Sequence, residues 1–461
     1  MEVATLEHRE MTLQRTQSTR QDGMAVLTVV LIMLFGVSIA VLYLNRHVIY
    51  EQRISANQMR STIAQEMAEA GLEWATGMLN DPRLIGTDCK PSTTSSNSFQ
   101  RKYFHQLPTT PASSYVASHV LAGCKVNPDD GTSTCNCPDA PTSGTVIASL
   151  GSNAMPGFTV QFSPVTGDPE AVRVVATGCS AMAKTCQPGT SGEADASASI
   201  TALLKFVPTL RAAPAAPLNC GLGCNISGSF NIQNQDSASG GLLINAGSSV
   251  SVSASALQTL PGLPPQRAIA DNDTSLYSLA HDDPSCINSS IFSAYFGSSV
   301  SDYVDSPLTK SITCITATDC GAQLGAAYLA GWRAFYFPAD LEINNSAPFT
   351  QLGAPNDGIS LVSAGRIDIN GNITIYGLLF MNNSNVNYLG TGTANVYGAA
   401  ITCGGFSSNG NGTLGYMPSA LSSLRMSSSV LARVPSSWTD RCSLGLPLPD
   451  AANTAASVIC N

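Results

Sequence analysis

The longest run of apolar positions in this chain lies near its start, from Met24 to Leu44, and contains no Asp, Glu, Lys, Arg or His. At a rise of about 1.5 Å per residue, a helix of roughly 21 residues spans about 30 Å, the thickness of the hydrocarbon core of a bilayer. A secretory signal peptide has a shorter apolar core and a cleavage site of small residues, whereas Asn45-Arg46-His47 follows this run. The pattern predicts a membrane-spanning helix, and topology alone leaves a plain signal anchor open.

The pattern beyond this run changes from wholly apolar to amphipathic but stays helical as far as Asn80. Apolar side chains recur at spacings of three or four residues, which places them on one face of a helix: Ile63, Met67, Ala70, Trp74 and Met78. No proline occurs before Asp81-Pro82, which ends the pattern. We therefore expect one long helix over residues 24–80. Its apolar stripe packs against the globular part of the same chain, against similar helices of other copies, or against both.

Alternating apolar and polar positions take over after the helix. Short runs at residues 158–162, 171–176 and 196–207 predict strands. Residues 81–207 are therefore expected to form a small β-rich head packed on the helix. Proline and alanine dominate residues 208–219, which predicts a linker.

The pattern changes again from Cys220, where short β-type runs alternate with Gly, Asn and Ser turns. The clearest repeat joins Tyr376-Gly377 to Tyr397-Gly398, about 21 residues further on. A period near 20 residues predicts a β-solenoid over residues 220–461, in which each rung covers the apolar edge of the previous one. An ordinary β-sandwich is the alternative. The expected fold class is α+β.

The cysteines add a constraint on the compartment. All fourteen lie at or beyond Cys89, on one side of the predicted membrane span. An even number in that position indicates disulfides in an oxidising compartment. The closely spaced candidates are Cys179 with Cys186, Cys220 with Cys224, and Cys314 with Cys320. Zinc is the competing interpretation, since Cys135-Asn136-Cys137 and Cys220 with Cys224 weakly resemble ligand pairs, but no second pair with His follows at suitable spacing.

Charge and motifs argue against several classes of function. Only 11% of residues are charged and the formal net charge is −9, without a basic stripe, so nucleic-acid binding is not expected. Two acidic segments could offer oxygen ligands to Ca²⁺, Asp271-Asn272-Asp273 and Asp129-Asp130-Gly131, but neither has EF-hand spacing. Turn formation explains both segments. Asp357, Arg366 and Asp368 are the only local charged group that suggests a carbohydrate-active site, and a solvated turn explains them. We predict no enzyme, no cofactor and no metal site.

Specific motifs add a family resemblance to this pattern. The segment Arg20-Gln21-Asp22-Gly23-Met24-Ala25-Val26-Leu27, followed by an apolar helix, resembles the N-terminus of PilX-type minor pilins of type IV pili. The stretch from Ala64 to Glu73, AQEMAEAGLE, is similar to a second motif of that family. Three later pieces follow in the family's order, at residues 270–276, 373–378 and 432–438.

The resemblance implies a processing route and a set of partners. Residues 1–23 would be a prepilin leader, which a prepilin peptidase removes after Gly23 before it methylates Met24. The mature chain would reside in the inner membrane, assemble with other minor and major pilins, and then stand on the cell surface in the pilus. Its large C-terminal region would serve adhesion or hold a tip adhesin. The alternatives are a membrane-anchored β-solenoid surface protein unrelated to pili, and a carbohydrate-active enzyme.

One residue departs from the pattern of major pilins. Their fifth mature residue is Glu, whereas this chain has Thr28 at that position. A carboxylate in lipid is costly and is tolerated when it pairs, for instance with the N-terminal amine of a neighbouring subunit. Thr28 cannot form that ion pair. The resemblance therefore implies a minor subunit that primes assembly and stays near the pilus tip, where no subunit above requires the pairing.

Overall fold

The computed structural model describes residues 22–440 apart from 96, 107–114, 118–119, 140–145, 148–153, 166–167, 183–185, 187–195, 253–256, 284–285, 287–288, 384–386, 389–392 and 409–410. The chain divides into two compact units, Met1–Arg60 and Ser61–Asn461. Helix α1 (Asp22–Leu79) is continuous across this boundary. We call Asp22–Arg60 the upper helix and Ser61–Leu79 the head-bound helix. A long apolar helix followed by a large β-rich region gives the α+β class that the sequence predicts.

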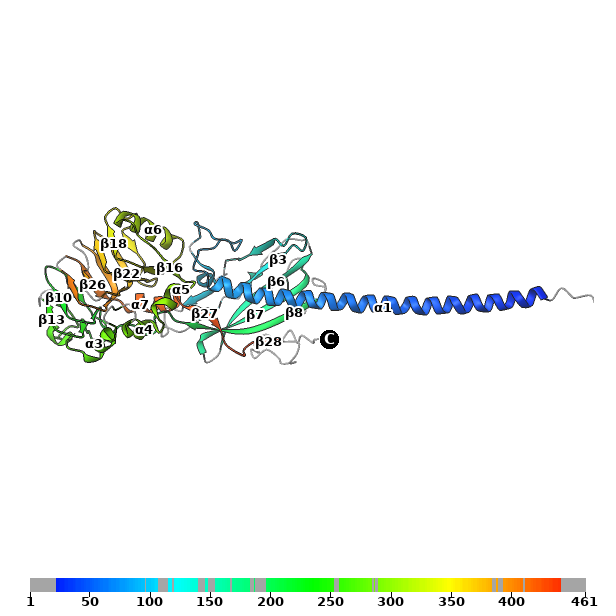
Figure 1. Cartoon of the computed structure of the whole chain (residues 1–461), viewed down its shortest axis with the longest axis horizontal. Helices are drawn as coiled ribbons and strands as arrows, with labels where there is room; N and C mark the ends of the chain where they lie inside the picture. The colour runs from blue at the N-terminus through cyan, green and yellow to red at the C-terminus, as the bar shows by residue number, and fades with distance from the viewer. Residues whose placement is uncertain are drawn as a thin grey trace, which may run out of the picture. The chain divides into compact units, whose positions relative to one another are not determined.

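The head is a largely antiparallel sheet, in which only β5 pairs parallel to its neighbour among the described strands, and a distant part of the chain returns to it. Its strands follow the order β27-β8-β7-β6-β3-β4, and Figure 1 labels β8, β7, β6 and β3 beside one another. The strands expected at 158–162, 171–176 and 196–207 lie within β6, β7 and β8. The bounds are β3 (Val120–Val126), β4 (Ser133–Asn136), β5 (Val146–Ile147), β6 (Met155–Val165), β7 (Asp168–Met182), β8 (Ser197–Val207), β27 (Val430–Arg433) and β28 (Thr439–Asp440). Helix α2 (Phe99–Tyr103) precedes the short pair β1 (Phe104–Gln106) and β2 (Tyr115–Ala117).

Residues 218–416 form a second β region, in which every pairing between described strands is parallel. The strands fall into three strips, and the sheets are open. The first strip contains β16 (Thr309–Ser311), β17 (Ala334–Phe337), β20 (Ile359–Ser363), the second halves of β22 (Thr374–Met381) and β24 (Asn395–Thr402), β9 (Leu218–Cys220), β12 (Ile244–Ala246) and β15 (Ile269–Ala270).

The other two strips contain shorter strands. The second contains β18 (Leu341–Asn344), β21 (Ile367–Asn370), β23 (Asn387–Tyr388), β25 (Phe406–Ser408), β10 (Cys224–Ile226) and β13 (Val250–Val252). The third contains β19 (Gln351–Leu352), the first halves of β22 and β24, β26 (Thr413–Tyr416), β11 (Asn231–Gln233) and β14 (Leu257–Gln258).

The strands of the β region do not stack in chain order. Strand β11 pairs with β14 on one side and with β26 on the other, although β26 lies about 180 residues further along the chain. Strand β10 lies in the same way between β13 and β25. The segment 218–233 therefore occupies the middle of the stack, between the segment 244–258 and the segment 395–416.

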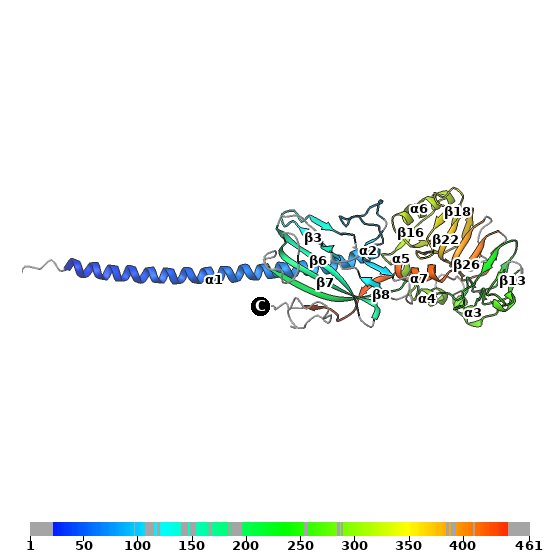
Figure 2. The same ribbon diagram turned by 180° about the vertical axis from the view of Figure 1, so that it is seen from behind.

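Inward-facing side chains of all three strips form one core. Alternation is strict in several strands, so that Ile232, Ile343 and Ile369 are buried while their neighbours face outward. The outer side of the first strip is also apolar, and Phe292, Phe296 and Leu421 cover it from the helices. These helices include α4 (Ser290–Phe296), α5 (Val300–Asp305) and α7 (Pro418–Ser427). Helices α3 (Thr274–His281) and α4 lie on the opposite side of the strand stack from α6 (Ala317–Leu329), as Figures 1 and 2 show.

The Tyr-Gly repeat occupies a bend between the third and the first strip. Tyr376 pairs with Tyr397 and Gly377 with Gly398 in the same register. The two glycines have φ angles of 144° and 148°, in a region that side chains rarely adopt. A Cβ on Gly398 would lie 1.9 Å from the carbonyl oxygen of Gly377, so the bend requires glycine in both strands.

Two expected boundaries are wrong. The segment 208–219 is not a free linker, because Leu210, Ala216 and Leu218 are buried and Leu218 already belongs to β9. Leu210 and Leu218 belong to the two apolar clusters of the β region. The end of the expected segment 220–461 also differs, because β27 and β28 leave the β region and pair with β8 of the head.

Candidate assembly surface on the N-terminal helix

The upper helix is the most exposed apolar element of the described chain. Its large apolar side chains are at least half exposed, as at Val26, Leu34, Phe35 and Leu42. Within the described residues, α1 alone has the length and composition to cross a membrane, with a mean hydropathy of 2.7 in its most apolar window. Such a surface is stable only in lipid or against other apolar surfaces.

The predicted processing and assembly residues lie at the start of this helix. Gly23 and Met24 are helical positions of α1, and Thr28 is an exposed position one turn further on. The rest of the predicted leader, residues 1–21, lies outside the described residues. The position that is Glu in major pilins therefore carries an uncharged hydroxyl in this helix.

The head-bound helix buries a stripe that differs from the predicted one. The buried positions are Ala64, Ala68, Gly71, Leu72, Ala75 and Leu79. Of the predicted stripe, Ile63, Met67, Trp74 and Met78 are half-buried at its edge, and Ala70 is exposed. The stripe predicted from the spacing of apolar residues was wrong by about one helical position. The sheet instead approaches the face with the smallest side chains, where the backbones come closest.

Glycine makes this close approach possible on both elements. A Cβ on Gly178 of β7 would lie 2.1 Å from the carbonyl oxygen of Ala64 and 2.3 Å from the nitrogen of Ala68. A Cβ on Gly71 would lie 2.9 Å from the ring of Phe158 in β6. Trp74 closes the edge of the contact, with its ring centroid 5.4 Å from that of Phe99. The head is therefore fixed to the helix by a backbone-to-backbone contact that larger residues would prevent.

The returning strand β27 secures the C-terminal end of the helix. The Asn80 side-chain amide donates to the carbonyl of Leu431 at 3.0 Å, and its Oδ1 accepts from the Leu431 N–H at 2.8 Å. Arg433 forms an ion pair with Glu73 at 2.7 Å. Sequence reasoning missed this contact. A polar Asn at the end of an amphipathic helix was the available signal, but nothing in the sequence identified its partner.

The six candidate cysteines lie in three disulfides. The structure joins Cys179 to Cys186, Cys220 to Cys224, and Cys314 to Cys320. Cys135 and Cys137, the weak zinc candidates, bond instead to Cys124 and Cys89.

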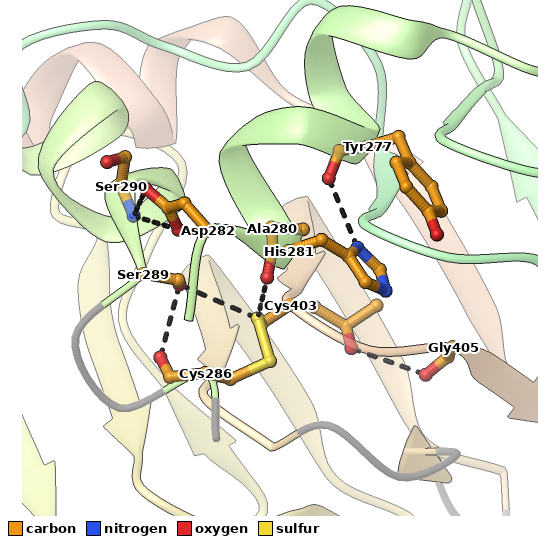
Figure 3. The surroundings of a disulfide bond; sticks show 10 residues. Tyr277, Ala280, His281, Asp282, Cys286, Ser289, Ser290, Cys403 and Gly405 are labelled. Atoms are coloured by element: carbon orange, nitrogen blue, oxygen red, sulfur yellow. Dashed lines mark hydrogen bonds between the residues drawn. A yellow bond between two sulfur atoms is a disulfide. The ribbon is translucent and has the colours of Figure 1, made fainter. Parts of the chain in front are cut away.

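A sixth described disulfide, Cys286–Cys403, joins segments that are 117 residues apart. It links the segment between α3 and α4 to the residue after β24. Both cysteines are buried, and the Cys403 sulfur contacts the carbonyl of Ala280 at 3.3 Å (Figure 3). Cys442 and Cys460 lie outside the described residues.

The charged group that suggested an enzyme is not brought together. Asp357 accepts from Arg101 at 2.6 Å and from Arg333 at 2.9 Å. Burial alone would raise the pKa of Asp357, but the two guanidinium groups outweigh burial and hold this pKa below its ordinary value. Arg366 instead pairs with Asp340 at 3.3 Å. The Arg101–Asp357–Arg333 triad joins α2 to the β region and has the form of a structural contact.

The acidic turn segments are also used locally. Asp273 accepts from the backbone N–H groups of Ser275 and Leu276 and caps α3. Asp130 accepts from Thr132 within its own turn. Among the described residues, no group of three or more His, Cys, Asp or Glu side chains has a metal-binding arrangement.

An apolar helix that continues into an α+β head defines the chain as a type IV pilin-like structural subunit. Residues 22–73 match the family model described as PilX N-terminal, so this N-terminal segment is of the PilX type. Such subunits interact with other pilins in a pilus. No curated protein matches the chain. Among solved structures, the crystal structure of the competence-associated pilin ComZ from Thermus thermophilus is similar at 12% identity and a TM-score of 0.21, over 83% of this chain and 97% of that chain.

Proposed function

We propose that the chain is a minor pilin that primes type IV pilus assembly and stays near the pilus tip. The observation that carries the proposal is the PilX-type helix α1. Its upper part exposes an uncharged apolar surface, and its lower part is fixed to a folded head. The upper helix resides in the inner membrane before assembly and packs against the helices of other minor and major pilins afterwards. Thr28 supports a place near the tip, because it cannot supply the carboxylate that a bulk subunit offers.

The β region is the displayed part of this proposed subunit. We infer that it is a β-solenoid, in which each rung passes through the three strips once. Parallel in-register pairing and a common inward-facing core support this arrangement over a β-sandwich, whose strands pair mostly antiparallel. Displayed outside the cell, this region serves adhesion or the attachment of a tip adhesin. The proposed role is structural rather than enzymatic, because Asp357 is held in an ion triad with Arg101 and Arg333.

The first experiment maps the mature N-terminus of the protein isolated from membranes. We expect a peptide that begins with methylated Met24, and we expect Gly23→Val to block cleavage. Gly36→Ala is the matched control, because a Cβ on Gly36 meets nothing within 4 Å. An intact leader in the wild type, or a cut beyond Leu44, would contradict the proposal.

The second experiment examines sheared pili. We expect the chain in the pilus fraction at a small ratio to the major pilin, and we expect fewer pili when its gene is deleted. A chain that stays in the membrane fraction of piliated cells, with pilus number unchanged on deletion, would favour a surface protein unrelated to pili. Turnover of a glycan by the purified protein would favour a carbohydrate-active enzyme.

A further inference from the structure

The outer face of the third strip has a composition unlike the rest of the β region. Along β22, β24 and β11 the pattern alternates, with one buried apolar residue between two partly exposed side chains. The outward side chains form two rows that run across the strands. The first row is Gln351, Thr374, Asn395, Thr413 and Asn231, and the second includes Tyr376, Tyr397, Gln233 and Gln258.

These rows are uncharged from end to end. Every outward side chain is an amide, a hydroxyl or a phenol, although the chain has a net charge of −9. The second strip differs, because Glu342 and Asp368 lie in register on adjacent strands. The first strip differs too, since apolar residues of α4 and α7 cover it. The third strip is therefore a neutral polar surface, and none of the large apolar side chains that are exposed in the described chain lies on it.

Tyr376 and Tyr397 supply the only rings in these two rows. The rings of Tyr376 and Tyr397 are stacked, with centroids 5.3 Å apart and planes inclined by 24°. Both side chains are partly exposed, and Tyr397 contacts Gly415 of the next strand, which leaves no side chain beside it in the row. Neighbouring strands lie about 4.8 Å apart, so the rows present a polar group or a ring at a step close to the length of one sugar unit.

A polar hollow adjoins the same face. Its volume is about 630 Å³, and it is lined by Asn344, Asn345, Asn370, Asn372, Ser346 and Thr393, with one glycine, Gly371. Residues 345–350 lead from β18 to β19, and residues 371–373 lead from β21 to β22. The hollow therefore lies at the corner where the second strip meets the third, beside the row that contains Thr374 and Asn395. Like the rows, it contains no charged side chain.

We propose that the third strip and this hollow bind a neutral glycan chain. Amide and hydroxyl groups both donate and accept hydrogen bonds, which suits the hydroxyl groups of sugars, and aromatic rings pack against the apolar face of a sugar ring. An anionic polymer would require Arg or Lys on the face, and the strip has neither. A protein partner would require an apolar centre, which the strip also lacks. The proposal rests on the display of the β region outside the cell and specifies what that display binds.

The test measures binding by the full-length protein in detergent micelles. The probes are soluble neutral hexasaccharides built from glucose, mannose, galactose or N-acetylglucosamine, with an oligogalacturonate as the acidic comparison. We expect binding of at least one neutral probe that does not weaken with added salt, because no charge takes part. Binding of the acidic probe alone, or of none of the probes, would overturn the proposal.

Variants locate the binding to the strip. The Tyr376→Ala/Tyr397→Ala double variant should weaken binding of the neutral probe by about tenfold or more, while the corresponding double Phe variant keeps the rings and most of the affinity. Asn225→Ala, an exposed position of the second strip, is the control and should bind as the wild type does. Thermal unfolding checks that each variant is folded. If folded Ala variants bind unchanged, or if they lose self-association instead of glycan binding, the proposal is wrong.

This test and the pilus experiments fail independently. A chain that is present in sheared pili but binds no glycan removes the inference and leaves the minor pilin role. A chain that binds through Tyr376 and Tyr397 but is absent from pili keeps the binding surface and removes the pilus role.

Discussion

The Cys286–Cys403 disulfide should contribute far more to the free energy of unfolding than the Cys220–Cys224 disulfide, although both belong to the same β region. The comparison uses two double variants, Cys286→Ala/Cys403→Ala and Cys220→Ala/Cys224→Ala. All four cysteines are at most 3% exposed, so the loss of packing is similar in the two variants. What differs is the length of chain that each bond closes, 117 residues in the first case and 4 in the second.

The expected magnitudes follow from that difference. Closing a loop removes conformational entropy from the unfolded chain, by an amount that grows with the logarithm of loop length. At about 25 °C the relation gives about 4.9 kcal/mol for the longer loop and about 1.9 kcal/mol for the shorter one. The two variants should therefore differ in free energy of unfolding by about 3 kcal/mol. The longer bond also holds the segment between α3 and α4 against the end of β24, as Figure 3 shows.

Urea unfolding of the protein in detergent, without reductant, measures this difference. Near-ultraviolet circular dichroism follows the tertiary packing, and linear extrapolation gives the free energy of unfolding. Mass spectrometry confirms that each variant lacks one disulfide and keeps the others. Equal losses in the two variants, or a smaller loss for Cys286→Ala/Cys403→Ala, would refute the assignment of the stabilisation to loop closure.

Three further predictions concern the contacts of the head with the helix and with the β region. Gly178→Ala should lower the free energy of unfolding by about 1–3 kcal/mol or more, because its Cβ would meet the backbone of the head-bound helix. Gly77→Ala, where a Cβ meets nothing within 4 Å, should raise the free energy of unfolding by about 0.5–1 kcal/mol. Equal effects of Gly178→Ala and Gly77→Ala in thermal or urea unfolding would contradict the close contact. Asp357→Asn should lower the free energy of unfolding by about 2–3 kcal/mol, because it leaves two guanidinium groups partly buried without a carboxylate. Glu73→Ala breaks an exposed ion pair and should lower it by less than about 1 kcal/mol. Because the folded pKa of Asp357 is lowered, its contribution should be complete above the unfolded pKa of about 3.9 and lost as pH falls through the lower folded pKa. The free energies of unfolding of the wild type and of Asp357→Asn, measured at decreasing pH, should therefore become equal below that range. A difference between them that persists at low pH would contradict the role of the carboxylate.

The sequence predicted the elements whose periodicity comes from the chain itself. The helix pattern from Met24 to Asn80 differs by no more than two residues at either end from α1, and the strands of β6, β7 and β8 follow from alternation. The Tyr-Gly repeat is confirmed as an in-register pairing, because the same bend requires glycine in each strand. These features depend on local backbone geometry, which neighbouring residues determine.

Contacts between distant segments were beyond the sequence. The predicted apolar stripe of the helix differs by about one position from the buried one. The spacing of apolar residues does not indicate that Gly178 lets the sheet approach Ala64 and Ala68. The return of β27 to the head depends on pairing between Leu431 and Phe206, which no spacing indicates. For the candidate site, the apolar helix and its uncharged Thr28 were accessible from sequence. The outward rows of the third strip were not, because they arise only when several strands align.

The middle position of segment 218–233 has a consequence for export. In the proposed export of this chain from an N-terminal membrane anchor, Leu218 and Ile232 would emerge long before Ala400 and Leu414, the residues that they pair with in the folded protein. The apolar side of the earliest segment therefore stays uncovered until the chain beyond residue 414 has been translocated. A chain that is cut or stalled before that point lacks the segment 395–416, which lies inside the strand stack and not at its edge. Partial products should then be open to proteolysis along the whole β region, and completion of translocation becomes the step that commits the subunit to its folded form.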